Sequence, residues 1–470
     1  MNINSIPGWM ALPFVALLGA IALFPLLAPR WWEQHYSKVA LGLGVLPVFF
    51  YLALLHQGPH LLETTHEYVS FICLIGSLFV VSGGIRITVK GESTPWVNTA
   101  MLAIGGIVAN LLGTTGASML LIRPYLRANK YRLTAYHVVF FIFIVSNVGG
   151  SLTPLGDPPL YLGFLKGVPF LWTVRSLYPA WLVGMAYLLI VFFVMDTFNF
   201  RRAPAEIRQK ETSHETWRFE GLANFGWLLI IMVALFIHSP PFLREGLMIF
   251  AAVMSWKTTS AEVHQGNDFS WGPLREVAVI FAGIFATMTP ALDWLEANAG
   301  HLGFQSAGSF YWGSGCLSSV LDNAPTYLNF MSAALGVFVD PASIQSVHQL
   351  LAHGGAIVST GSQDPNGYEI VRTVAFLKQY YPALRDGSAV SSALIETCFL
   401  LANYSKHVVA ISIGCVFFGA NTYIGNGPNF MVKNIAEHGG AKMPTFFGYI
   451  FKYSIPILLP LLGLISWLFF

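Results

Sequence analysis

The chain has 470 residues, of which 55% are hydrophobic and only 10% are charged, whereas an ordinary soluble domain has about 25% charged residues. This shortage of charge excludes an ordinary soluble protein, and the net charge of +2 without a basic tract argues against a nucleic-acid-binding protein. The composition predicts a chain that crosses a membrane several times.

A membrane span needs about 20 apolar residues. The first apolar run has no Lys or Arg before it and is longer than the core of a signal peptide, so we expect a true span there. Continuous spans are predicted at about 8–29, 38–56, 67–86, 172–196, 222–239, 242–256, 273–291 and 445–470, and two interrupted spans near 134–165 and 404–434.

Lys and Arg in short loops predict which side of the membrane each loop occupies. In the first half they place the loops after the first and third spans inside the cell, and the four basic residues at 123–132 mark the inside again. The segment 97–122 therefore starts and ends on one side, and it is broken at 113–118, which predicts a re-entrant helical hairpin. The basic segment 197–220 is predicted to be a cytoplasmic linker.

The second half follows the same order with the opposite insertion. The segment 305–336 is apolar but broken at 318–326, which predicts a second hairpin that enters from outside. The more polar region 340–390 is expected to form an external excursion. The last span then leaves the C-terminus outside, and the N-terminus is expected there as well.

The two halves are also related in register. Thr115 pairs with Asp322 at a separation of 207 residues (322 − 115), and Gly76 pairs with Gly283 at the same separation. In the broken spans, four residues match at a separation of 269 (422 − 153): Gly150, Thr153, Gly156 and Pro159 with Gly419, Thr422, Gly425 and Pro428. We therefore predict an all-α membrane protein of two inverted-topology repeats, 1–196 and 221–470, each with a re-entrant hairpin and a broken transmembrane helix.

The polar stretches 146–159 and 419–428 lie at membrane depth in this topology. Irregular backbone is tolerated there only where it is buried in protein or lines a wet cavity, and such broken helices form the ion and substrate sites of secondary transporters. Carbonyl, hydroxyl and carboxylate oxygens are hard ligands that suit a small cation. Intramembrane carboxylates are costly, so Asp157 and Asp322 are the strongest candidates.

The candidate site combines these carboxylates with amides, small hydroxyl residues and one glycine of the broken segments. The substrate- and ion-binding candidates are Asn147, Thr153, Gly156, Asp157, Ser318, Asp322, Asn323, Thr326, Asn421, Thr422, Asn426, Thr114, Thr115 and Ser118, and the sodium ligands among them are Asn147, Asp157, Asp322 and Asn323. For each carboxylate, the alternative is a cap on a half-helix. For each hydroxyl, it is close helix packing.

Two motifs carry a family resemblance: Ser146-Asn147-x-Gly149-Gly150…Thr153-Pro154-x-Gly156-Asp157 and Ser318…Asp322-Asn323-x-Pro325. They resemble the ion transporter superfamily, which includes divalent-anion/sodium symporters, arsenite carriers, citrate carriers and NhaD-type sodium/proton antiporters. The resemblance implies a scaffold domain, a transport domain with two hairpins, a homodimer and elevator-like movement. It also implies that Asn147, Asp157, Ser318, Asp322 and Asn323 form the cation and proton site.

The chain departs from those relatives at three places. Thr115-Gly116 stands where the antiporters would have an acidic pair, Pro158-Pro159 is similar to the anion symporters, and the serine-asparagine-threonine tips of dicarboxylate symporters are absent. The chain therefore resembles a distinct branch of the superfamily, the citrate transporter-like branch.

Paired intramembrane carboxylates favour a sodium/proton antiporter, and a sodium-coupled carboxylate symporter with a citrate-like substrate is the alternative. An enzyme is not expected, because no His/Cys cluster, HExxH motif or Walker-type loop is present. We expect no permanently bound cofactor, with Na⁺ and H⁺ as transported or coupling ions. The expected location is a bacterial inner (plasma) membrane, and the expected partners are the bilayer and a second copy of the chain, with no nucleic acid.

Overall fold

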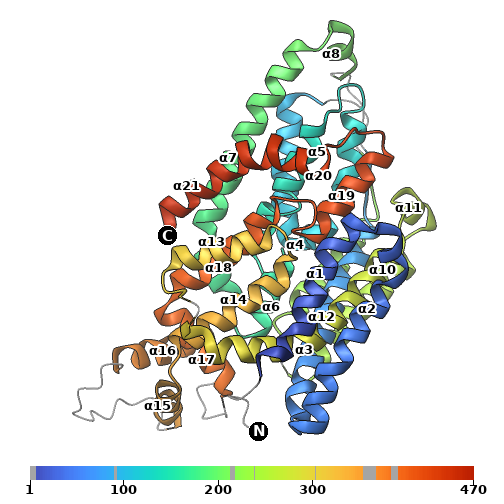
Figure 1. The fold of residues 1–470 in the computed structure, drawn as a ribbon. Helices are drawn as coiled ribbons and strands as arrows, with labels where there is room; N and C mark the ends of the chain where they lie inside the picture. Colours follow the sequence, from blue (N-terminus) through green and yellow to red (C-terminus); the bar gives the residue numbers. More distant parts are fainter. Residues whose placement is uncertain are drawn as a thin grey trace.

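The computed structural model describes residues 7–88, 93–211, 218–237, 239–301, 303–352, 367–382 and 390–470 (Figure 1). In these ranges the chain is almost entirely helical. The α-helices are α1 (Leu12–Leu27), α2 (Pro29–Phe49), α3 (Gly58–Gly83), α4 (Pro95–Ala128), α5 (Ala135–Ile144), α6 (Pro158–Leu165), α7 (Phe170–Arg202), α8 (Ala205–Glu211), α9 (Asn224–Ala234), α10 (Leu243–Thr258), α11 (Ala261–Gly266), α12 (Gly272–Asn298), α13 (Ala307–Ser318), α14 (Asn323–Phe338), α15 (Pro341–Ala352), α16 (Gly367–Tyr380), α17 (Ser392–Asn403), α18 (Ser405–Gly419), α19 (Gly427–His438), α20 (Phe446–Tyr449) and α21 (Leu459–Phe469).

Shorter helical pieces extend or link these helices. They are 3₁₀ helices at Gly8–Ala11, Val148–Leu152 and Ala299–His301, and π-helical segments at Phe50–Leu54 and Ile450–Leu458. The two strands, β1 (Arg86–Thr88) and β2 (Arg218–Glu220), pair antiparallel and place Arg86 opposite Glu220. The sheet thus ties the end of α3 to the predicted linker, and an ion pair of 3.3 Å joins the same two residues.

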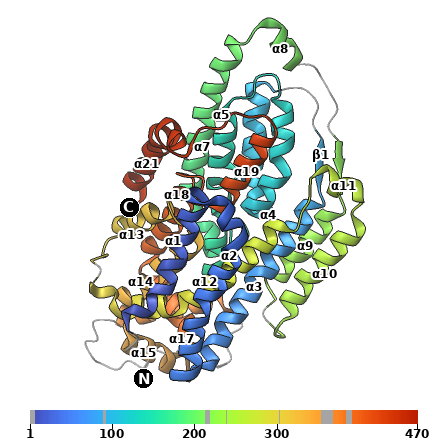
Figure 2. The ribbon, with the colours of Figure 1, turned by 45° about the vertical axis from the view of Figure 1, so that its right-hand side comes forward.

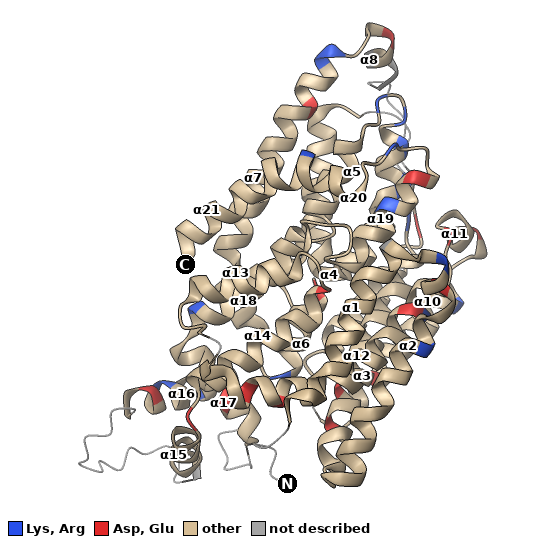
Figure 3. Cartoon of the chain, in the orientation of Figure 1, with Lys and Arg blue, Asp and Glu red and all other residues tan. Residues whose placement is uncertain are grey.

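The surface of the helices is apolar, as expected for helices that face lipid. Large apolar side chains such as Leu27 and Trp467 are 76% and 80% exposed, and continuous exposure of this kind would drive a soluble protein to aggregate. In Figure 3, Lys, Arg, Asp and Glu gather around α8, along the right-hand side near α19, α10 and α11, and around α16 and α17, and most of the helix surface between these places is without them. Among the described residues, eight helices are long and apolar enough to cross a membrane, or up to ten if each of two bent helix pairs counts as one span. The chain is therefore a multi-pass membrane protein.

The helices form two bundles. The first bundle consists of α1, α2, α3, α9, α10 and α12, and the second of α4–α7, α13, α14, α18, α19 and α21. Contacts of α3 with α4 and α6, and of α12 with α14, join the two bundles. Figure 2 shows α9–α11 on the opposite side of the molecule from α13 and α21. One continuous apolar core runs through both bundles.

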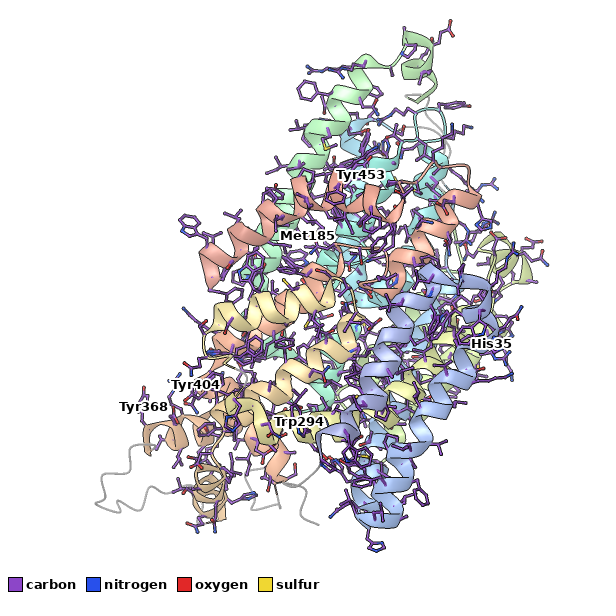
Figure 4. The ribbon with its side chains drawn as sticks, in the orientation of Figure 1. His35, Met185, Trp294, Tyr368, Tyr404 and Tyr453 are labelled. Atoms are coloured by element: carbon purple, nitrogen blue, oxygen red, sulfur yellow. The ribbon has the colours of Figure 1, made fainter. Side chains whose placement is uncertain are left out.

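Glycines allow the closest approaches within the second bundle. A Cβ atom added to Gly106 of α4 would lie 2.5 Å from the terminal methyl group of Met185 and 3.4 Å from the Cα atom of Gly149. Met185, labelled in Figure 4, lies on α7 in the interior of this bundle. The missing side chain at Gly106 therefore lets α4 pack directly against the unwound segment that follows α5.

Four breaks interrupt helices of the second bundle. α4 is broken at Gly113, whose φ of 75° and ψ of 155° are accessible essentially to glycine alone. The chain leaves helical geometry between α5 and α6, between α13 and α14, and between α18 and α19. All four breaks lie at the polar stretches that the sequence singles out.

Two expected spans are shorter than the sequence predicts. The region 222–239 contains the 11-residue α9, and 242–256 overlaps the 16-residue α10, which begins at Leu243. Neither belongs to the eight span-length helices. Proline explains the short helices, because Pro240 and Pro241 lie between them and cannot extend an α-helix.

Part of the region 340–390 is described, and it is helical. α15, α16 and α17 pack around a small apolar core of their own that includes Val347, Leu377 and Phe399. Residues 353–366 and 383–389 lie outside the described ranges, as do 212–217 of the predicted linker. Figure 1 places the α15–α17 unit at the opposite end of the molecule from α8.

Candidate functional site

The unwound segment after α5 follows from its glycines and prolines. A side chain at Gly150 or Gly156 would collide with the backbone of the other residue, so the loop closes on itself only because both positions are glycine. Pro154 and Pro158 prevent a continuous helix. α6 then begins at Pro158, directly after Asp157.

Asp157 is the centre of the site. Its side chain is 1% exposed, and its two carboxylate oxygens accept three hydrogen bonds. The hydroxyl of Thr114 and the amide of Asn426 donate to Oδ1 at 2.8 and 3.2 Å, and the amide of Asn323 donates to Oδ2 at 2.6 Å. All three donors are uncharged and come from different helix breaks, so the carboxylate is stabilised without a basic partner. The N-terminus of α6 adds partial positive charge.

Asn147 connects the two unwound segments. Its amide nitrogen donates to the carbonyl of Ile142 at 2.8 Å and to Oδ1 of Asn429 at 2.7 Å. Its own Oδ1 accepts a hydrogen bond from Asn426 at 3.2 Å. Asn147 therefore holds the end of α5 against the start of α19, and it presents one oxygen toward the residues around Asp157.

Asp322 and Asn323 lie at the start of α14 but have different environments. Asp322 is partly exposed and caps α14, because its Oδ1 accepts a hydrogen bond from the backbone N–H of Ala324 at 3.0 Å. Thr326 donates its hydroxyl to the carbonyl of Asp322 at 2.9 Å. Asn323 is fully buried, and its Oδ1 has no hydrogen-bond partner.

The other predicted residues either make hydrogen bonds that hold the loops in place or line a cavity. Thr153 donates to the carbonyl of Asn110 and Thr422 to the carbonyl of Ser319, both at 2.6 Å. Asn421 donates to Oγ of Ser319 at 3.0 Å, and Ser318 donates to the carbonyl of Cys415 at 2.6 Å. Ser118 and Ser146 share a hydrogen bond of 2.8 Å. None of these five predicted residues contacts Asp157 through a described hydrogen bond. Thr115 and Gly156 instead line the cavity beside Asp157.

That cavity lies between the two bundles. Its volume is about 40 Å³, and its walls include Leu78 of α3, Thr115 of α4, and Asp157 and Tyr161 at the start of α6. A single water needs roughly 10–15 Å³, so the cavity has room for about three waters or one small ion. No Lys or Arg is among its wall residues.

Two asparagines of the site were not among the predicted residues. Asn429 accepts the hydrogen bond from Asn147 and donates to the carbonyls of Gly419 and Thr422 at 2.8 and 2.9 Å. Asn110 likewise bonds to the backbone of the first unwound segment. Its amide nitrogen donates to the carbonyl of Gly149 at 2.7 Å, and its Oδ1 accepts from the N–H of Leu152 at 3.0 Å. Asn110 is a buried polar residue inside the mostly apolar α4, and that signal is visible in the sequence, whereas Asn429 is the third residue of the more polar α19.

The two halves make matching contacts at the breaks. The pair Thr153 and Asn110 repeats as Thr422 and Ser319, with the same hydrogen bond and the same distance. Thr114 and Asn323 are each the first residue after a break, and both bind Asp157. These contacts relate α4 to α13–α14 by 209 residues (323 − 114), two more than the sequence pairing of Thr115 with Asp322 gives.

The sequence was also compared with known proteins. The model of the family described as "Putative citrate transport" matches residues 3–470, which is almost the whole chain. No curated protein matches it.

Proposed function

We propose, from the premise that the chain belongs to this family of transport proteins, that it is a secondary active transporter that exchanges Na⁺ for H⁺ at Asp157. The observation that carries this proposal is a carboxylate that is 1% exposed, solvated by three uncharged donors and placed beside a cavity of about 40 Å³. A charge at the centre of a span costs about 2.5–3.5 kcal/mol on insertion scales, so charges kept there generally have a function.

The exchange itself is simple. The protonated carboxyl of Asp157 releases its proton, and the resulting carboxylate takes up Na⁺, so one cation replaces another at the same group. Carbonyl and side-chain oxygens of the unwound segments complete the coordination, with Asn147, Asn323 and Asp322 as the proposed sodium ligands. Neither Lys nor Arg lines the cavity, which leaves a cation rather than an anion as the better match to its charge.

An inverted repeat is the arrangement that we propose for alternating access. The matching contacts of Thr153 and Thr422, and of Thr114 and Asn323, support it. We assign the hairpins to α4 and to α13–α14, with tips at Gly113 and at 319–322. In this proposal the second bundle moves the site across the membrane while the first bundle stays fixed, and a homodimer anchors the first bundle.

Ion flux in sealed proteoliposomes tests the exchange. Vesicles loaded at acid pH should become alkaline inside when Na⁺ is added outside, and Asp157→Asn should abolish the response while the protein stays folded. Li⁺ should be tested in parallel, because ions of similar size and charge should compete for hard oxygen ligands. If no alkali cation changes the internal pH, the antiport proposal is wrong.

The second candidate is a sodium-coupled carboxylate symporter, which the citrate transport description of the family favours. It requires that backbone N–H groups at helix N-termini hold the anion. The cavity of about 40 Å³ is small for a tricarboxylate, so this candidate requires a more open conformation. Na⁺-dependent accumulation of radiolabelled citrate in the same vesicles, without Na⁺-driven pH change, would decide for it.

A further inference from the structure

The amide nitrogen of Asn426 has three possible acceptors, and one of them belongs to the carboxylate of Asp157. The nitrogen lies 3.1 Å from the carbonyl oxygen of Ser146, 3.2 Å from Oδ1 of Asn147 and 3.2 Å from Oδ1 of Asp157. An amide nitrogen carries two hydrogens, so it cannot donate a direct bond to all three acceptors at once. All three distances are at the long end of the hydrogen-bond range.

Neighbouring Asn429 shows the contrast. Its amide nitrogen donates to two carbonyls at 2.8 and 2.9 Å, which is one short bond for each hydrogen. Asn426 instead lies among three oxygens of different types, one of them a carboxylate. Carbonyl and carboxylate oxygens are the ligand types that suit a small hard cation.

A further observation points to a ligand at this place. Asn323, which binds the other oxygen of Asp157, is fully buried and its Oδ1 has no hydrogen-bond partner, although buried polar atoms are normally paired. The missing side chain of Gly419 allows this close packing, because a Cβ atom there would lie 3.2 Å from both Oδ1 of Asn147 and the carbonyl oxygen of Gly425. Asp157 therefore joins the oxygens around Asn426 to a buried residue with an unpaired acceptor.

We propose that the amide group of Asn426 occupies the place of the cation in this conformation, and that Na⁺ displaces it when it binds between Ser146, Asn147 and Asp157. This proposal rests on the cation transport function above. Hard cations of this size bind oxygen at about 2.3–2.6 Å, so the three groups close in by several tenths of an ångström as Asn426 turns away. Asn426 thus competes with the ion and helps to release it.

Asn426 also has a specific relation to Asp157. Each residue directly precedes a half-helix that starts with a Pro at its first or second position, and their backbone angles are similar, with φ and ψ of −144° and 142° for Asp157 and −152° and 138° for Asn426. The two residues are 269 positions apart (426 − 157), the separation that relates the broken segments. At equivalent positions the chain thus has one carboxylate, which holds the ion, and one amide, which replaces it.

Na⁺ binding to the purified full-length protein tests this directly. We expect Asn426→Ala to bind Na⁺ about tenfold more tightly in calorimetric titration, because tenfold corresponds to about one hydrogen bond to a charged group. Asn426→Ser should behave in the same way, because serine remains a good residue before a helix but is too short to reach the three oxygens. Unchanged or weaker Na⁺ binding in both variants would overturn the proposal. Weaker binding is expected if Asn426 is itself a sodium ligand, and unchanged binding if its hydrogen bonds only hold the two segments together.

Two controls separate the possible causes. Asn224 is a buried asparagine of α9 whose amide nitrogen also contacts three oxygens, at 2.8, 3.1 and 2.9 Å, far along the chain from the site. Asn224→Ala should lower the unfolding temperature but leave the Na⁺ affinity unchanged. If its Na⁺ affinity changed, the effect of the Asn426 variants could come from altered protein stability instead of from the site. If the unmodified protein itself binds no Na⁺, the proposed transport function fails instead.

Discussion

Asp157 and Asp322 are both carboxylates near the helix breaks, but they differ in exposure and in their hydrogen-bond partners. Asp157 receives its hydrogen bonds from side chains of three distant segments, Thr114, Asn323 and Asn426. Asp322 is partly exposed and caps α14 through the N–H of Ala324. Removing the charge of Asp322 should therefore change ion handling more than it changes folding.

This difference predicts the behaviour of Asp322→Asn. Asparagine caps a helix about as well as aspartate, so we expect the free energy of unfolding to change by less than about 0.5 kcal/mol. Na⁺-driven proton exchange should fall severalfold, because one of the proposed sodium ligands loses its charge. Chemical unfolding and vesicle flux measure the two effects, and unchanged flux with full stability would reduce Asp322 to a helix cap.

At the scale of one helix, the break in α4 depends on a single residue. Gly113 has a φ of 75° and a ψ of 155°, a region that costs other residues about 1–3 kcal/mol. A Cβ atom at this position would also lie 3.3 Å from the carbonyl oxygen of Leu155. The backbone here sets the position of Thr114, whose hydroxyl binds Asp157.

Gly113→Ala should therefore destabilise the protein by about 1–3 kcal/mol and reduce Na⁺ binding. The matched control is Gly19→Ala in the middle of α1, where an added Cβ meets nothing within 4 Å and where alanine should be neutral or stabilising. Thermal unfolding in detergent and calorimetric Na⁺ titration compare the two variants. Equal effects of the two substitutions would contradict a special role for the break.

The helix breaks could be predicted from the sequence, but the pairing of their residues could not. Gly, Pro and Asn clusters inside apolar runs identify all four breaks because no continuous helix tolerates them. The sequence pairs Thr115 with Asp322 by polarity, whereas the contacts to Asp157 pair Thr114 with Asn323, because the first residue after each break faces the site. Asn429 was missed because it lies inside a helix after the loop.

Helix length is the second feature that was not predicted correctly from the sequence. α9 is an apolar helix, yet both α9 and α10 are shorter than span length because Pro240 and Pro241 separate them. The side of the membrane on which each terminus lies stays a prediction from loop charge. The division into repeats at 1–196 and 221–470 also stays a prediction, supported by the matching contacts at the breaks.

At the scale of the whole molecule, the corner after α6 connects three parts of the fold. The ammonium group of Lys166 pairs with the carboxylate of Glu67 on α3 at 2.7 Å. The carbonyls of Lys166 and Gly167 accept hydrogen bonds from Thr397 and Tyr381 of the α15–α17 region, both at 2.7 Å. Nearby, Tyr161 donates to the carbonyl of Ser70 on α3 at 3.3 Å. If the second bundle moves past the first, the contacts to α3 must break while those to the α15–α17 region stay.

This arrangement predicts that the ion pair between Lys166 and Glu67 acts as a latch, which means that it holds the two bundles together in this conformation. In a chain without its native cysteines, Ile75→Cys places a thiol in the cavity wall on α3. Adding Glu67→Gln should make this thiol react severalfold faster with an impermeant reagent applied from the side of α15–α17, because the bundles separate more often. The charge-reversed pair Glu67→Lys with Lys166→Glu should restore slow labelling, and equal rates in all three chains would exclude the latch.

The most direct measurement for the account as a whole is Na⁺-driven proton movement in vesicles that contain the unmodified chain or Asp157→Asn. Ion exchange at Asp157 predicts that external Na⁺ makes acid-loaded vesicles alkaline with the unmodified chain and has no effect with the variant, while both proteins unfold at similar temperatures. The same alkalinisation with Asp157→Asn, or none with either chain, would contradict ion exchange at this buried carboxylate.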